Sequence, residues 1–185
     1  MQAQTQAQTQ TSPGREERFV SSVIQRCQQD KGLAARLRRA DNPATEYQSW
    51  ELLAGYGIDL EDERQRLPFV TIAAAIAKAK TERNGSLSLG RAIADCYDNG
   101  SEKGRDSDQA KARLRRLLAC DELAELCRIL RPLFSLIDSK AGQPLDFLRL
   151  LKQLRRFGFA GQQVKAQWAQ EFYGQPLATD EGAGA

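Results

Sequence analysis

Apolar residues return every three or four positions along nearly the whole chain, which is the spacing of one face of an α-helix. The first such segment runs from Phe19 to Cys27, and Gly32 separates it from a second at 33–40. No segment alternates between apolar and polar residues in the manner of a half-buried strand. The pattern therefore predicts an all-α protein.

Caps and prolines divide the pattern into further helices. Asn42 followed by Pro43 predicts a helix start, because asparagine caps well and proline suits the first helical position. Pro68 is expected to open an alanine-rich helix, and Ser88 is expected to cap a short one that ends near Cys96. Four more helices are expected at 107–119, 121–137, 145–157 and 162–173.

The predicted organisation is a two-lobed helical bundle between two loose ends. The first residues repeat Gln, Thr and Ala and offer nothing to bury, which is typical of disorder. The predicted parts are a disordered extension at 1–14, an N-terminal lobe at 15–97, a loop at 98–106, a C-terminal lobe at 107–174 and a tail at 175–185.

Composition excludes most catalytic chemistry. The chain has no histidine, and its four cysteines form no CxxC pair, which argues against zinc and against the usual nucleophile–base pairs. Trp50 and Trp168 could stack on bases, but they lie among apolar neighbours at helical spacing and are expected in the core. No apolar run reaches the roughly 20 residues that span a bilayer. We expect a cytoplasmic protein that is not an enzyme and binds no metal, cofactor or membrane.

Charge is unevenly distributed, although the formal net charge is only +3. Residues 41–66 hold seven acids against two bases, and residues 105–156 hold twelve bases against seven acids. Such polarity can steer an anion to one side of a molecule and meet a protein partner on another.

Three Leu-Arg-Arg triplets stand at 37–39, 114–116 and 154–156, each late in a helical segment. The leucine is expected to face the core while the guanidiniums project outward, where their planar forks suit phosphate. Basic residues in a last helical turn also complement the helix dipole without any ligand. The basic faces of the three helices between 107 and 157 carry Lys111, Arg113, Arg115, Arg116, Arg128, Arg131, Arg149, Lys152, Arg155 and Arg156, with few compensating acids. These faces favour an anionic partner.

From residue 86 onward the chain resembles the small helical subunit of type I-E CRISPR Cascade surveillance complexes. The resemblance rests on the ordered series GSLSLGRAIAD, ARLRRLLACDELAELCRILRPLFSLI, GQPLDFLRLLKQLRRFG and VKAQWAQEFYG, and more weakly on DKGLAARLRRA at 30–40. It implies a non-enzymatic all-α subunit that pairs head to tail with a second copy. It also implies contact with the other Cascade subunits, with the hybrid of guide RNA and target DNA, and with the displaced DNA strand.

The resemblance also implies individual nucleic-acid contacts by position. The residues that match basic positions of the family are Arg38, Arg39, Arg91, Arg113, Arg131 and Lys152. Glu122 stands where relatives can carry arginine, so the family's contact does not transfer there. Arg131 is expected to be exposed, so that Arg131→Glu would weaken strand binding without lowering thermal stability.

Two other functions stay open at this point. A helical adaptor would use the arginines to dock acidic partner subunits. A free-standing DNA-binding regulator would need a recognition helix with base-reading side chains after a short turn, and no segment fits that requirement well.

Overall fold

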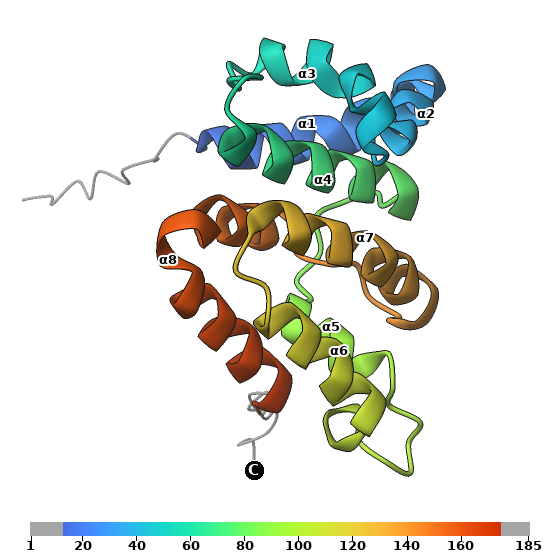
Figure 1. The fold of residues 1–185 in the computed structure, drawn as a ribbon. Helices are drawn as coiled ribbons and strands as arrows, with labels where there is room; N and C mark the ends of the chain where they lie inside the picture. Colours follow the sequence, from blue (N-terminus) through green and yellow to red (C-terminus); the bar gives the residue numbers. More distant parts are fainter. Residues whose placement is uncertain (1–12, 175–185) are drawn as a thin grey trace, which may run out of the picture.

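The structure is a computed structural model and describes residues 13–174. Most of the extension predicted at 1–14, and the tail predicted at 175–185, therefore lie outside the described residues. The described part is helical and holds no named strand, only an isolated bridge between Leu87 and Leu145. The prediction of an all-α fold is confirmed (Figure 1).

Eight α-helices and two short 3₁₀-helices make up the described chain. In chain order they are α1 (Arg15–Gln29), α2 (Lys31–Arg39), η1 (Pro43–Ser49), α3 (Trp50–Gly55), α4 (Glu63–Ala79), α5 (Leu89–Asp95), η2 (Gly104–Asp106), α6 (Asp108–Leu118), α7 (Leu123–Lys140) and α8 (Phe147–Tyr173).

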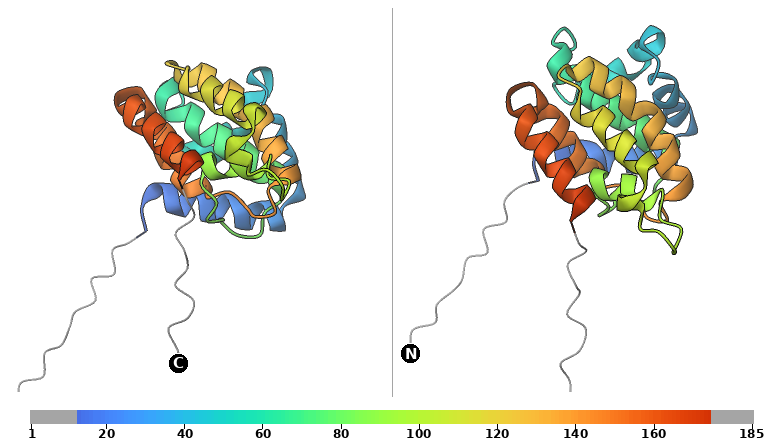
Figure 2. Two further views of the ribbon diagram at one scale, coloured as in Figure 1. Left: turned by 90° about the horizontal axis from the view of Figure 1, so that it is seen from below. Right: turned by 60° about the horizontal axis from the view of Figure 1, so that its bottom comes forward.

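Helix α4 lies at the centre of the molecule. It packs against α1 and α2 on one side and against α7 and α8 on the other (Figure 1). In both views of Figure 2 the red half of α8 lies along one edge of the molecule, on the opposite side from α7. Every residue from Leu67 to Ala77 is buried, and the run of alanines lets the neighbouring helices approach closely.

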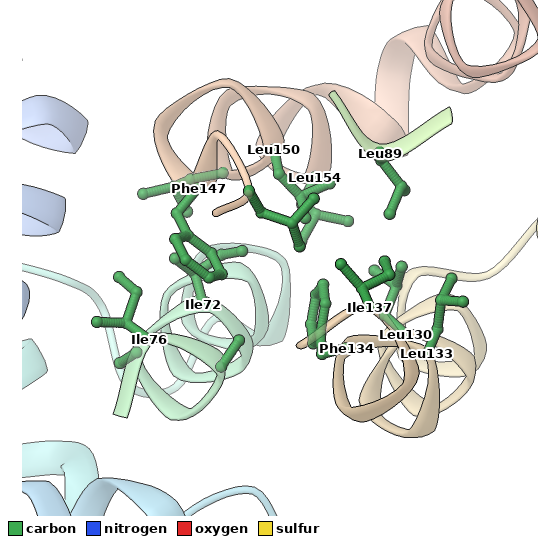
Figure 3. Packing of buried hydrophobic residues seen from close by; sticks show 14 of the residues in the cluster. Ile72, Ile76, Leu89, Leu130, Leu133, Phe134, Ile137, Phe147, Leu150 and Leu154 are labelled. Atoms are coloured by element: carbon green, nitrogen blue, oxygen red, sulfur yellow. The ribbon is translucent and has the colours of Figure 1, made fainter. Parts of the chain in front are cut away.

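The apolar core is continuous across the two halves of the chain. Figure 3 shows Ile72 and Ile76 of α4 facing Phe147 of α8, with Phe134 of α7 beside them. Short α5 packs most extensively on α8 and carries Leu89 into the same core. The division into lobes at 97–98 stays a prediction, and α4 is the element that both groups of helices share.

Two expected helix boundaries are wrong. Helix α4 begins at Glu63 rather than at Pro68, because Asp62 caps it by accepting a hydrogen bond from the Arg64 N–H at 2.9 Å. Pro68 is tolerated in the second turn, where it removes a single backbone hydrogen bond. The two helices expected at 145–157 and 162–173 are one helix, α8, with a kink at Ala160, whose φ is −133° and ψ is 33°.

The start expected at Asn42 is confirmed in a shorter form. The Asn42 side chain accepts a hydrogen bond from the Ala44 N–H at 3.0 Å, and Pro43 occupies the first helical position. The turns that follow form the 3₁₀-helix η1 before α3 begins at Trp50. The cap is thus readable from sequence, whereas the type of helix is not.

The contact between α5 and α8 is close enough to require a glycine. A Cβ atom on Gly90 would lie 2.2 Å from the Trp168 carbonyl oxygen. The Gly90 N–H donates to Glu171 at 3.1 Å, and the Trp168 indole N–H donates to the buried Gln153 at 2.9 Å. The first of these hydrogen bonds joins α5 to the second half of α8, and the other joins the two halves of α8 across the kink.

Gly90→Ala should lower the free energy of unfolding by about 1–3 kcal/mol, because the new methyl group would push α5 away from the α8 backbone. Urea denaturation followed by circular dichroism measures the change. Gly142→Ala is the matched control, since a Cβ there meets nothing within 4 Å. Equal stability of the two variants would show that α5 can shift without cost.

Candidate nucleic-acid interface

The three Leu-Arg-Arg triplets have the geometry that their pattern predicts. Leu37, Leu114 and Leu154 are completely buried, and the arginines that follow each of them turn toward the surface. The leucines anchor each helix, so the backbone positions of the guanidiniums are set by core packing. The triplets differ, however, in what their arginines contact.

Helix α6 presents the largest group of cations without a carboxylate partner among the described residues. Lys111 donates to the Asp106 carbonyl at 2.8 Å, and Arg113 donates to the Tyr97 hydroxyl at 3.3 Å. Arg115 and Arg116 are exposed and their side chains form no ion pair or hydrogen bond within residues 13–174. Their charges are free for an external anion.

The first half of α8 carries a second group. Lys152 and Arg156 are exposed and, within the described chain, have no carboxylate partner. Arg155 forms an ion pair with Glu16 of α1. Burial tends to raise the pKa of Glu16, but hydrogen bonds from its backbone N–H and from Arg155 hold that pKa below the ordinary value. Glu16 is therefore ionised at neutral pH, and its ion pair is with Arg155.

The arginines at the end of α2 are held by neutral groups. Arg38 donates to the Ala77 carbonyl of α4 at 3.3 Å, and Arg39 donates to the Gln48 side chain at 2.9 Å. Arg38 also borders a groove of about 370 Å³, together with Lys31 and Lys80. The charges of both arginines are uncompensated, since neither side chain contacts a carboxylate in the described structure.

Arg131 is not the exposed residue that was expected. Its side chain is only 18% exposed, and its Nε lies 3.3 Å from an oxygen of Asp41, within ion-pair distance but without hydrogen-bond geometry. Asp41 also pairs with Lys78. Helix α7 packs on α4 and thereby brings Arg131 over the loop that follows α2. The expectation of an exposed Arg131 is therefore wrong, and we now predict that Arg131→Glu lowers thermal stability, because the change would set two carboxylates against each other.

The remaining candidates are exposed or half-buried arginines that lie near carboxylates of the same chain. The three pairs are Arg91 with Asp95 at 2.7 Å, Arg128 with Glu125 at 3.7 Å and Arg149 with Glu171 at 2.6 Å. The well-exposed Arg128–Glu125 pair is worth at most about 1 kcal/mol, so a phosphate can compete for Arg128, whereas the Glu171 carboxylate that holds Arg149 is only 8% exposed. The structure thus ranks the candidates by how much charge is already compensated.

One aromatic residue near the α8 cations was missed in the sequence. Phe159 is 80% exposed and lies beside Lys152 and Arg156. The available signal was the spacing of positions 152, 156 and 159, which places the three on one helix face. Trp168 is buried as expected, whereas Trp50 is 42% exposed and the expectation of a core residue is wrong for it.

Nothing in the described residues suggests catalysis or membrane insertion. Within residues 13–174 no three His, Cys, Asp or Glu side chains gather in a way that could hold a metal ion. Burial raises the pKa of all four cysteines, that of Cys127 to about 11, so the thiols are protonated at neutral pH. None of the helices in this range is long and apolar enough to cross a bilayer.

Arg131→Ala should lower the free energy of unfolding by about 1–3 kcal/mol, because it leaves Asp41 mostly buried with a single partner. Chemical denaturation measures the loss. Arg128→Ala, one turn earlier on α7 and well exposed, is the control and should change stability by less than about 0.5 kcal/mol. A similar stability for both variants would mean that the Asp41 contact contributes little.

The chain matches a known protein family and is similar to several solved structures. The family model of the CRISPR-associated protein Cse2 matches residues 33–173. The crystal structure of M. ruber CasB is similar with a TM-score of 0.68 and 26% identity, covering 86% of this chain and 93% of that one. No curated protein sequence matches the chain.

Two further solved structures share the fold. A CRISPR-associated protein of the Cse2 family from Thermus thermophilus has a TM-score of 0.66 and 24% identity, covering 86% of this chain and 98% of that one. A chain of a CRISPR RNA-guided surveillance complex has a TM-score of 0.65 and 21% identity, covering 85% and 90%. The match to the family model extends over most of the chain and includes its basic helices, and the protein therefore belongs to the CRISPR-associated Cse2 family.

Proposed function

We propose that this protein is a non-catalytic subunit of an RNA-guided antiviral surveillance complex. It binds the backbone of the guide–target hybrid and of the displaced DNA strand, and so stabilises the R-loop. Membership of the Cse2 family and the likeness in fold to a chain of a CRISPR RNA-guided surveillance complex support this role. The role requires a cytoplasmic protein, because guide RNA and invading DNA meet there.

The observation that carries the proposal is the set of exposed cations without a carboxylate partner on α6 and on the first half of α8. Arg115, Arg116, Lys152 and Arg156 lie on helices whose other faces are buried in the core. Core packing thus fixes the helix backbones that carry these side chains before any ligand binds. Phosphate contacts from such side chains do not depend on the base sequence. This suits a subunit that has to work with every guide RNA.

Modest contacts are sufficient for this task. An R-loop exchanges a DNA duplex for a hybrid of similar stability, so a few backbone contacts decide whether the open state persists. A basic surface on a rigid helical scaffold supplies these contacts without any change in the protein. The other Cascade subunits and a second, head-to-tail copy of this chain are the protein partners in this proposal.

A helical adaptor is the competing function, and a specific observation favours it. Arg91, Arg128, Arg131, Arg149 and Arg155 all lie near carboxylates of their own chain, which shows that arginines of this protein find acidic partners readily. In the adaptor, Arg115 and Arg116 would dock acidic surfaces of neighbouring subunits instead of phosphates. Salt-dependent binding to a free DNA strand distinguishes the two functions.

Replacing Arg115 and Arg116 together by glutamine should weaken binding to a fluorescent oligo-dT strand, as measured by anisotropy. Each lost phosphate contact should also reduce the slope of log affinity against log salt by about 0.7, so the double variant should lose about 1.4. Arg26→Gln combined with Arg64→Gln removes the same charge from exposed positions on α1 and α4 and is the matched control. The control variant should keep the wild-type slope.

Two outcomes would count against the proposal. An unchanged slope in the Arg115/Arg116 variant would show that α6 does not contact the strand. Normal strand binding together with failure to assemble with co-expressed Cascade subunits would favour the adaptor.

A further inference from the structure

Phe159 is the exception among the phenylalanines of this chain. The other six are buried, whereas Phe159 is 80% exposed. The exposed tyrosines and Trp50 each carry a polar group that water can solvate, but a phenylalanine ring has none. A single exposed ring is common on protein surfaces, so the residues around Phe159 decide whether it has a ligand.

The surroundings of Phe159 are cationic. Lys152, Arg155, Arg156 and Glu16 line a groove of about 340 Å³ with the ring. Because Glu16 pairs with Arg155, the two charges of Lys152 and Arg156 stay uncompensated within the described residues. A ligand of this groove therefore carries negative charge as well as an apolar or aromatic group.

The helix geometry leaves the ring accessible. Positions 152, 156 and 159 share one face of α8 and extend over about 10 Å along its axis. Gly158 and Gly161 flank the ring in sequence and carry no side chains that could cover it, and α8 kinks at Ala160 directly after it. Figure 1 shows the kink where the orange part of α8 turns into the red part.

We propose that Phe159 stacks on an unpaired base of a single DNA or RNA strand whose phosphates are bound by Lys152 and Arg156. Aromatic rings and backbone cations are the combination that binds single strands without sequence preference, because every base has a π-face. A duplex offers no unstacked base, so the site selects single strands. This inference rests on the proposed function and names the ligand of the α8 part of the surface.

The test is Phe159→Leu, which keeps the apolar surface but removes the π-system. Its affinity for fluorescent oligo-dT should fall by about tenfold, the range expected for one stacked base. The salt slope should not change, because no charge is lost. Tyr173→Leu, an exposed aromatic residue at the end of α8, is the matched control and should bind as the wild type does.

A second probe separates stacking from phosphate binding. An abasic strand of the same length keeps its phosphates, so the wild type and Phe159→Leu should bind it equally. In Phe159→Trp, added oligo-dT should quench tryptophan emission beyond the change seen in the wild type. The wild type has a buried Trp168 and an exposed Trp50, and Trp50 accounts for any background.

The failures are distinguishable. If the wild type binds oligo-dT and Phe159→Leu binds it equally well, base stacking is overturned while the proposed function stands. If the wild type binds no single strand, the proposed function is overturned together with this inference. If Phe159→Leu binds DNA normally but no longer assembles with co-expressed Cascade subunits, the ring is a protein contact and the stacking role is overturned.

Discussion

Burial of α4 on nearly every side is the constraint on which the rest of this structure depends. An ordinary amphipathic helix buries one face, but every residue from Leu67 to Ala77 is buried, so α1, α2, α7 and α8 must all lie around it. The small alanines allow this close approach, and the surrounding helices then hold their outward faces in fixed positions. Helix α8 packs directly on α4, and α6 packs on α5 and α8, so both basic helices are held by the same core.

The same packing decides which charges are compensated. Where helices meet, cations lose water and need a partner, so Asp41 holds Arg131, Glu16 holds Arg155 and Asp121 holds Lys165 at 2.8 Å. Where a helix face stays in water no partner is required, and Arg115, Arg116, Lys152 and Arg156 keep free charges. The division between arginines that are paired within the fold and arginines whose charge is left uncompensated thus follows solvent access rather than residue type.

Much of the fold follows from local sequence patterns. The helical period, the Asn42 cap and the buried leucines of the three triplets each depend on neighbours a few positions away. The position of Pro68 within α4 and the continuity of α8 through its kink could not be predicted in this way. Proline is compatible both with a helix start and with the second turn, and an interrupted pattern is compatible both with a loop and with a kink.

The sequence by itself determined that the protein is all-α, that its cations concentrate between residues 105 and 156, and which family it resembles, because these are properties of composition, period and local motif. Only the tertiary structure decided that Arg131 lies largely buried against Asp41 and that Phe159 stands exposed beside Lys152 and Arg156. Arg131 and Asp41 are 90 positions apart, and a helical pattern states which face of each helix is apolar but not which helices meet. Which helices pack together decides whether an arginine is buried against a carboxylate or exposed to water. The role of each cation is therefore a property of the folded molecule.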